Sequence, residues 1–306
     1  MLKSMRMDIV KKVDIQITVK SERGTEIPTG IIIPEHKKDQ NVPLVVVCHG
    51  YMGSKDEDGY FYGGVHAGSC AGVTEQLADL GIATVRMSFP GCGDSKESFE
   101  FYNNKNMVSD AEKAYEHMLQ NYPIDIDNVG LLGWSNGGRI GALFADQHPE
   151  VKVMVLWAPA AANGAAMWHD IMMSSGQDYD KLFHESKTTG KAKITWPDGH
   201  KADYLGWEFF KQNIEAKPLD ALKKYKGETL MIVPDKDIVV PAWVYNDIIE
   251  NTTIKHVTIT GADHSFGVDT NLPRLTEINL DITTAYLYKY LVNSSISKIK
   301  GGTENG

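Results

Sequence analysis

A serine stands in a glycine-rich hexapeptide, Gly133-Trp134-Ser135-Asn136-Gly137-Gly138, which directly follows the apolar run Val129–Leu132. This is the G-x-S-x-G pattern in a strand-to-helix context, where the serine hydroxyl projects above the end of the strand. Glycines on both sides leave room for so tight a turn. The pattern predicts that Ser135 is a nucleophile. The plainer alternative is a serine that only caps a helix in a Gly-rich turn.

A base for this serine is expected after the last strand of the sheet. His264 lies in Gly261-Ala262-Asp263-His264-Ser265-Phe266, just past the strand-like run His256–Ile259. A serine hydroxyl is a weak nucleophile until a base within hydrogen-bond reach takes its proton. Ligands of open α/β sheets bind at the carboxyl ends of the strands, so this loop can approach Ser135. Its place in the chain favours His264 as the base over a surface histidine.

Two carboxylates, Asp235 and Asp237, compete to orient that histidine. The imidazole needs an acid that fixes its tautomer and stabilises the imidazolium. Both follow the strand-like run Thr229–Val233, and Asp237 directly precedes the apolar run Ile238–Val240, which we expect to hold it inward. We therefore favour Asp237 and predict a triad in the chain order Ser, Asp, His.

Two backbone N–H groups are candidates for an oxyanion hole. The segment His49-Gly50-Tyr51-Met52-Gly53 follows the strand-like run Leu44–Cys48, and Gly50 permits an unusual turn there. The N–H of Tyr51 and the N–H of Asn136 are expected to stabilise the developing oxyanion. Because backbone groups act here, the two side chains need not take part. We interpret His49 as a structural hydrogen-bonding residue rather than a second base.

The elements that must position these residues alternate along the chain. A leading antiparallel hairpin, Asp14–Val19 with Ile27–Ile33, precedes short runs rich in Val and Ile that alternate with helical segments. This alternation predicts the α/β class, with a mostly parallel twisted sheet flanked by helices. The later strands are expected at 44–48, 82–87, 129–132, 153–157, 229–233 and 256–259, and the helices at 73–80, 108–120, 136–147, 242–249 and 275–291.

One interval interrupts the alternation. The stretch between the strand that ends at Trp157 and the strand that starts at Thr229 is longer than a crossover needs. We expect it to form a small inserted lid over the site, although a surface excursion with its own core is the alternative. The predicted division is an α/β-hydrolase core at 1–160 and 225–295, a lid at 161–224 and a disordered tail at 296–306.

Large apolar side chains of this lid are the expected contacts for substrate. They are Met167, Trp168, Trp207 and Phe209. Such side chains exclude water and bind an apolar acyl or aryl group. The alternative is that they only pack the lid onto the core.

Composition and charge narrow the class of protein. The 306 residues carry a net charge of −9, which argues against nucleic acid or anionic lipid as a partner. No apolar run is long enough to span a membrane, and the amino-terminal residues lack the apolar core of a secretory signal, so we expect a cytoplasmic protein. The three cysteines do not form a disulfide framework, and no Cys/His spacing suggests a metal. We expect no cofactor and no metal.

Several motifs together resemble the bacterial cinnamoyl and feruloyl esterases of the α/β-hydrolase superfamily. They are His49-Gly50, Phe89-Pro90-Gly91-Cys92-Gly93-Asp94-Ser95, Gly133–Gly138, Ala158-Pro159-Ala160-Ala161, Asp237 and Gly261-Ala262-Asp263-His264. The resemblance runs from about Ile27 to Leu291 and implies a monomeric or homodimeric esterase with a small lid, acting on esters of aromatic acids. It assigns the triad and the oxyanion donors to the residues named above.

The chain departs from that pattern at places that bear on substrate. These esterases commonly present an Asp soon after the Pro-Ala-Ala segment and a Tyr in the lid, both toward a phenolic hydroxyl, where this chain has Ala165 and Phe209. A site without such partners has less reason to prefer a hydroxylated ring. The segment 56–72, after the oxyanion loop, is also longer than the pattern, and we expect it to reshape the pocket.

The sequence thus predicts a serine hydrolase that forms an acyl-enzyme on Ser135 and cleaves small-molecule carboxylic esters. A peptidase or amidase of the same fold shares the triad and stays an alternative. A haloalkane dehalogenase or epoxide hydrolase would carry Asp in place of Ser135. A non-catalytic binding protein on this fold would usually have lost a member of the triad.

Overall fold

The computed structural model describes residues 12–36, 40–56, 70–196, 199 and 201–293. Most of the expected long segment after the oxyanion loop, 57–69, and the expected disordered tail, 296–306, lie outside the described residues.

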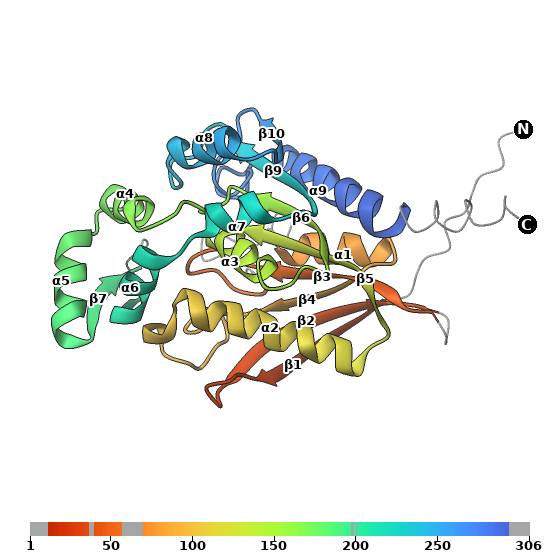
Figure 1. The fold of residues 1–306 in the computed structure, drawn as a ribbon, viewed down its shortest axis with the longest axis horizontal. Helices are drawn as coiled ribbons and strands as arrows, with labels where there is room; N and C mark the ends of the chain where they lie inside the picture. The colour runs from red at the N-terminus through yellow and green to blue at the C-terminus, as the bar shows by residue number, and fades with distance from the viewer. Residues whose placement is uncertain (1–11, 37–39, 57–69, 197–198, 200, 294–306) are drawn as a thin grey trace, which may run out of the picture.

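Eight strands of the described chain form one central sheet, drawn in Figure 1. They are β1 (Lys12–Lys20), β2 (Glu26–Pro34), β3 (Val42–Cys48), β4 (Ala83–Met87), β5 (Ile124–Trp134), β6 (Val151–Trp157), β9 (Glu228–Pro234) and β10 (Lys255–Ile259). Their order across the sheet is β1-β2-β4-β3-β5-β6-β9-β10. β1 pairs antiparallel with β2 and β2 with β4, whereas the remaining neighbours are parallel. The predicted hairpin and the predicted mostly parallel sheet are confirmed.

Helices cover the sheet, and the reason is the composition of its strands. β3, β4 and β6 are almost wholly buried, as continuous Val and Ile runs require of strands covered on both faces. Figure 1 shows α2 (Asn104–Asn121) and α3 (Asn136–Ala145) packed together in front of the sheet. α1 (Cys70–Asp79) contacts α9 (Pro273–Tyr288), which continues into a π-helical turn at Lys289–Asn293. The predicted α/β class is confirmed.

The long interval after β6 folds into its own set of elements. They are α4 (Ala166–Ser174), α5 (Tyr179–Thr189), a hairpin of β7 (Lys191–Thr195) and β8 (Ala202–Gly206), α6 (Trp207–Glu215) and α7 (Pro218–Lys224). Figure 1 shows α4, α5 and α6 at one end of the molecule, whereas α7 packs on α3 of the core. The hairpin was not expected from the sequence. That this segment forms a lid, and that the lid spans 161–224, stay predictions.

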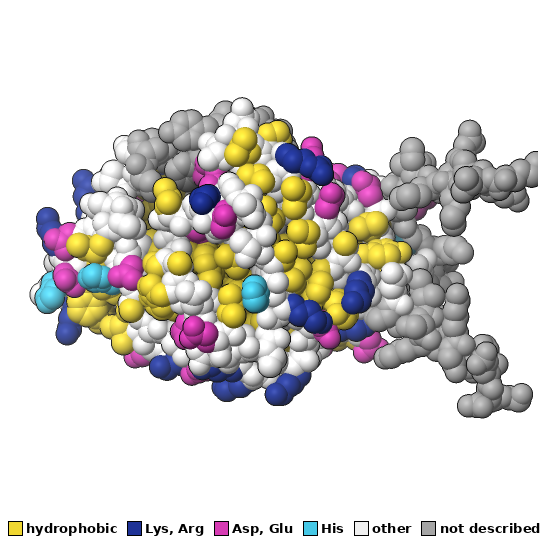
Figure 2. All heavy atoms as spheres, turned by 90° about the horizontal axis from the view of Figure 1, so that it is seen from above, with side chains coloured by type: hydrophobic (Ala, Val, Ile, Leu, Met, Phe, Trp, Pro, Cys, Tyr) yellow, Lys and Arg dark blue, Asp and Glu magenta, His cyan; other side chains and the backbone are white. Residues whose placement is uncertain are grey.

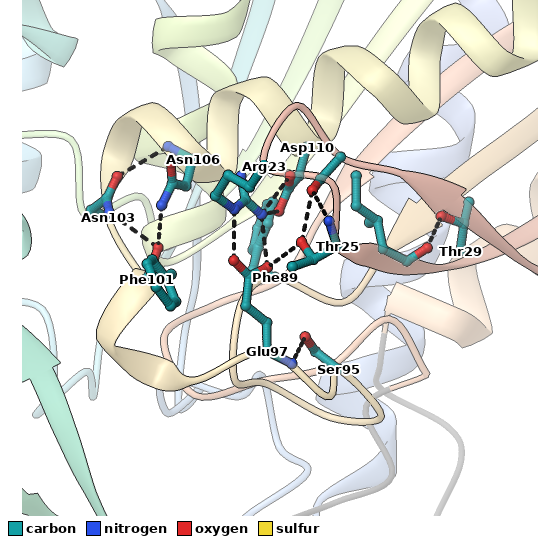
Figure 3. Close-up of polar contacts among 12 residues, drawn as sticks. Arg23, Thr25, Thr29, Phe89, Ser95, Glu97, Phe101, Asn103, Asn106 and Asp110 are labelled. Atoms are coloured by element: carbon teal, nitrogen blue, oxygen red, sulfur yellow. Dashed lines mark hydrogen bonds and ion pairs between the residues drawn. The ribbon is translucent and has the colours of Figure 1, made fainter.

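A buried ion cluster anchors the loop between β4 and α2, as Figure 3 shows. Arg23 Nε donates to Glu97 Oε1 at 2.7 Å, and its Nη2 lies 2.9 Å from Asp110 Oδ2 on α2. Thr25 adds a hydroxyl to Glu97 Oε2 at 3.0 Å. The pKa of Asp110 is raised to about 6, mainly by burial and in part by repulsion from the nearby Glu97 carboxylate, while Arg23 opposes the rise. The loop is therefore held to the β1–β2 hairpin and to α2.

None of the helices within the described ranges is both long and apolar enough to cross a membrane.

Candidate active site

Ser135 lies in a strained turn between β5 and α3. Its φ is 54° and its ψ is −119°, a backbone conformation that residues other than glycine rarely adopt. The turn is held from both sides, because the Ser135 N–H donates to the Trp157 carbonyl at 2.8 Å and the Ser135 carbonyl accepts from the Ala160 N–H at 2.9 Å. Such strain, of order 1–3 kcal/mol, persists where the surrounding structure enforces it, and it clusters at active sites. The geometry is that of a nucleophile elbow.

Glycines make this turn possible by letting backbone segments touch. A Cβ on Gly137 would lie 2.0 Å from the Cys48 carbonyl oxygen, and one on Gly133 would lie 2.5 Å from the Gly137 carbonyl oxygen. The start of α3 therefore rests directly on the end of β3. As a result Gly50 also comes beside the nucleophile, since a Cβ there would be 3.3 Å from the Ser135 Cβ.

Asp237 and His264, predicted from separate loops, are joined by a hydrogen bond. His264 Nδ1 donates to Asp237 Oδ2 at 2.8 Å. Because a carboxylate only accepts, the imidazole proton sits on Nδ1, and Nε2 is the free basic nitrogen. The Asp237 side chain is 3% exposed. Burial raises the pKa of Asp237, but the hydrogen bonds it accepts, first from His264, outweigh this effect and leave the pKa below its usual value.

The expected reason for the inward position of Asp237 is wrong in part. The apolar side chains after it do not all hold it, because Ile238 is 88% exposed. The backbone does so instead: Asp237 Oδ1 accepts the N–H groups of Val239 at 2.7 Å and Val240 at 3.0 Å. Of the run, only Val240 is buried.

Asp235, the competing carboxylate, has a different partner. Its Oδ1 accepts the Gly261 N–H at 2.6 Å, which ties the β9 loop to the loop after β10. The structure thus gives Asp235 a backbone-bracing position and Asp237 the contact with the imidazole.

Trp134 brings the His264 loop to the elbow. Its Nε1 donates to the His264 carbonyl at 3.1 Å, and the two rings lie 5.8 Å apart between centroids. Trp134 precedes Ser135, so the predicted base lies against the residue next to the predicted nucleophile. Within the described part of the chain the Ser135 hydroxyl makes no hydrogen bond. Catalytic hydrogen bonds are often long without substrate and tighten in the reacting complex.

Of the two predicted oxyanion donors, the Asn136 N–H directly follows the nucleophile and the Tyr51 N–H belongs to the loop that approaches it. Asn136 opens α3, where unpaired N–H groups and the helix dipole favour negative charge. Its side chain faces the core, where Nδ2 donates to the Tyr102 hydroxyl at 2.8 Å. Tyr51 follows Gly50, the residue that approaches Ser135.

His49 is held by backbone groups on both sides of its ring. Its Nε2 accepts the Phe89 N–H at 3.0 Å, so Nδ1 carries the proton and donates to the Gly50 carbonyl at 2.7 Å. Burial lowers the pKa of His49 to about 4. These contacts fit the structural role expected for it.

An aromatic cluster joins the oxyanion loop to the lid. The Tyr51 ring lies 5.2 Å from Trp168, 5.5 Å from Tyr102 and 6.3 Å from Phe209 between centroids. Among the described residues, the Tyr51 hydroxyl and Trp168 Nε1 are buried and have no hydrogen-bond partner. Two of the four predicted substrate contacts, Trp168 and Phe209, therefore meet beside the oxyanion loop.

The other two predicted substrate contacts are placed differently. The Trp207 ring packs on Phe183 within the lid at 5.2 Å, and Met167 is fully buried. Their roles toward substrate stay predictions.

Sequence reasoning missed two tyrosines of this region. The Tyr245 hydroxyl, on α8 (Ala242–Asn251), donates to Asp237 Oδ2 at 2.5 Å. Tyr102 accepts from Asn136 and stacks on Phe99 at 4.7 Å. Neither lies in a recognisable motif. The only available signal was helical spacing after Asp237, which does not single out Tyr245.

Exposed apolar side chains follow the acid at the start of α8. Besides Ile238, Val239 and Trp243 are each 38% exposed. Figure 2 shows a broad band of hydrophobic side chains across the face on which α8 lies, with charged side chains on either side. Trp243 Nε1 donates to Asp170 Oδ2 at 3.0 Å, which links α8 to α4 of the lid. Within the described ranges no group of three or more His, Cys, Asp or Glu could hold a metal ion.

A family model described as "Serine aminopeptidase, S33" matches residues 39–203, more than half of the chain. An uncharacterized protein of Caenorhabditis elegans is 34% identical over 85 residues, which are 28% of this chain and only 17% of that protein. The chain thus matches less than a fifth of the length of that relative.

Solved structures that are similar to this chain include esterases. Est1E from Butyrivibrio proteoclasticus with bound ferulic acid has a TM-score of 0.70 at 18% identity, covering 90% of this chain and 98% of Est1E. The esterase domain of a Rhodothermus marinus protein has a TM-score of 0.64 at 17% identity, covering 91% and 99%. Identities this low establish a shared fold, and the predicted α/β-hydrolase fold is confirmed.

Proposed function

Because the chain belongs to the serine aminopeptidase S33 family of α/β hydrolases, we propose that it is a serine hydrolase that cleaves carboxylic esters through an acyl-enzyme on Ser135. The observation that carries the proposal is the buried pair of His264 and Asp237, 2.8 Å apart, in loops beside the strained Ser135 elbow. A nucleophile, a base and an acid that orients the base are the parts this chemistry needs.

In the first half of the proposed reaction, the Ser135 hydroxyl attacks the ester carbonyl while His264 Nε2 takes its proton. Asp237 holds the imidazole and stabilises the imidazolium that forms. The N–H groups of Tyr51 and Asn136 receive the oxyanion, and each such donor is worth about 3–4 kcal/mol to the transition state. The imidazolium then gives its proton to the alcohol as the ester C–O bond breaks.

In the second half, water replaces the alcohol. His264 takes a proton from the water as it attacks the acyl-enzyme carbonyl. The tetrahedral intermediate collapses, and the proton returns to the Ser135 oxygen as the acid leaves. The same two oxyanion donors serve both halves.

The acyl group is proposed to be aromatic or otherwise apolar. The support is the cluster of Tyr51, Trp168 and Phe209, which places aromatic faces beside the oxyanion loop. Esters of aromatic acids are thus the narrower proposed class. Phe209 and Ala165 offer no polar atom to a phenolic hydroxyl, so we expect no strong preference for a hydroxylated ring.

The test compares p-nitrophenyl esters of short, long and aryl acids with aminoacyl p-nitroanilides, using Ser135→Ala as the control. We expect the esters to turn over faster and a fluorophosphonate to label the protein stoichiometrically. Faster cleavage of the anilides would replace the esterase with a peptidase, the activity in the name of the family. A folded but unlabelled protein would favour a non-catalytic binding role.

A further inference from the structure

We propose that Tyr245 is a positioning residue, whose hydroxyl shares one oxygen of Asp237 with His264 and thereby limits how strongly that carboxylate stabilises the imidazolium. The inference rests on the proposed function of His264 as the base.

The contacts of Asp237 divide between its two oxygens. Oδ1 accepts two backbone N–H groups, from Val239 and Val240. Oδ2 accepts His264 Nδ1 at 2.8 Å and the Tyr245 hydroxyl at 2.5 Å. A carboxylate offers about four lone-pair positions, so this one is saturated. Rotation of the carboxylate would break bonds on both oxygens, and its orientation toward the imidazole is fixed.

Burial strengthens the hydrogen bond between the Tyr245 hydroxyl and Asp237. Tyr245 is 4% exposed, so little water is at hand to replace Asp237 as the partner of its hydroxyl. Hydrogen bonds to an ionised group are stronger than neutral ones, and more so at a dry site. Burial raises the pKa of Tyr245 well above 10, so the hydroxyl stays a donor across the working range.

The shared oxygen has an electrostatic consequence. A donor on Oδ2 offsets part of the negative charge that faces His264 Nδ1, which weakens the attraction between Asp237 and the imidazolium. Without the hydroxyl, the full charge of Oδ2 would act on the imidazole. The protonated base would then be favoured, and the neutral base would appear only at a higher pH.

Other charged groups near the imidazole lie on its own loop and on the Asp237 loop. Asp269 interacts electrostatically with both Asp263 and His264, and Lys236 lies on the Asp237 loop. Tyr245 is the titratable group that α8 contributes to Asp237. Tyr245→Phe leaves the three other charges in place, so a change in the titration of the base would come from the lost hydroxyl.

The experiment compares Tyr245→Phe with Tyr225→Phe. Tyr225 is the matched control, because its hydroxyl donates to the Val151 carbonyl at 2.8 Å and makes no contact with the triad. Two quantities are measured in each protein: the midpoint of the His264 imidazole titration by NMR, and the midpoint of the acid limb of kcat/KM for a p-nitrophenyl ester. We expect both to move upward by about 0.5–1 pH unit in Tyr245→Phe alone.

The outcomes separate the two proposals. Unmoved midpoints in a folded Tyr245→Phe protein would overturn the positioning role and leave only a packing role. A wild-type protein that neither hydrolyses esters nor reacts with a fluorophosphonate would refute the proposed function, yet the NMR midpoint would still decide the role of Tyr245. An equal shift in Tyr225→Phe would also overturn it, since loss of any buried tyrosine hydroxyl would then suffice.

Discussion

The Asp237–His264 pair and the aromatic cluster of Tyr51, Trp168 and Phe209 differ in how their buried polar atoms are bonded. Both oxygens of Asp237 have two donors each. In the cluster, the Tyr51 hydroxyl and Trp168 Nε1 have no partner among the described residues. A buried polar atom left unbonded costs about 1–3 kcal/mol. The carboxylate proposed to orient the base thus has its full set of donors, whereas the aromatic cluster holds two buried polar atoms without a partner among the described residues.

The largest expected effect removes the nucleophile. Ser135→Ala should lower kcat/KM by about 10⁴-fold or more, because the elbow and the proposed oxyanion donors remain but no acyl-enzyme forms. Fluorophosphonate labelling should vanish, while the midpoint of thermal unfolding stays near that of the wild type. Retention of a tenth of the activity by a folded variant would show that the hydrolysis comes from another residue.

The second effect distinguishes the two neighbouring carboxylates. Asp237→Asn should lower kcat/KM by about 10³–10⁴-fold, because an amide cannot stabilise the imidazolium and favours the wrong tautomer. Asp235→Asn keeps a carbonyl oxygen for the Gly261 N–H and should cost less than about tenfold. Steady-state kinetics on one ester measures both, and the reverse ranking would identify Asp235 as the acid.

The same two regions show which parts of the site could be predicted from the sequence and which could not. Ser135, Asp237 and His264 each follow a strand in a loop with a clear local signal, and parallel topology brings the carboxyl ends of strands together. The fold was predictable as well, because a continuous run of Val and Ile indicates a strand that is buried on both faces. The reason for the inward position of Asp237 could not be predicted, because backbone N–H groups hold it and every residue except proline carries one.

The segment 161–224, predicted as a lid, was less predictable for a physical reason. Its aromatic side chains have no period, so their spacing does not tell which of them face the core. Trp168 and Phe209 meet Tyr51, but Trp207, two residues before Phe209, packs on Phe183. Tyr102 and Tyr245 were missed because each acts through one hydroxyl whose partner is distant in sequence or lies eight residues away, with no motif between them.

Replacing one tyrosine by phenylalanine in each of the two regions tests the comparison most directly. Tyr245→Phe removes a bonded hydroxyl and should lower the free energy of unfolding by about 2 kcal/mol. Tyr51→Phe removes an unbonded hydroxyl and should leave that free energy unchanged or raise it by about 1 kcal/mol. Urea unfolding at pH 7 measures both. Equal losses in the two variants would mean that the cluster is as fully bonded as the triad.

The smallest effect concerns the ion cluster that anchors the loop carrying Tyr102. Both carboxylates of this cluster are bonded, and they share the guanidinium of Arg23. The pKa of Asp110, raised to about 6 by burial, exceeds the value of about 4 expected in the unfolded chain. Between pH 4 and pH 6 the folded protein therefore binds the Asp110 proton more tightly than the unfolded chain does. The contribution of this group to the free energy of unfolding increases as pH falls from 6 toward 4 and is lost as pH rises through 6.

Asp110→Asn removes this contribution while keeping an oxygen for Arg23. Relative to the variant, the wild type should gain about 1 kcal/mol in free energy of unfolding between pH 6 and pH 5. Urea unfolding of both proteins across this pH range measures the difference in their free energies of unfolding. The titration of the other carboxylates is common to both proteins and cancels in this difference. Parallel stability curves would mean that Arg23 holds both carboxylates ionised, and the anchor would then resemble the saturated Asp237 more than the incomplete cluster around Tyr51.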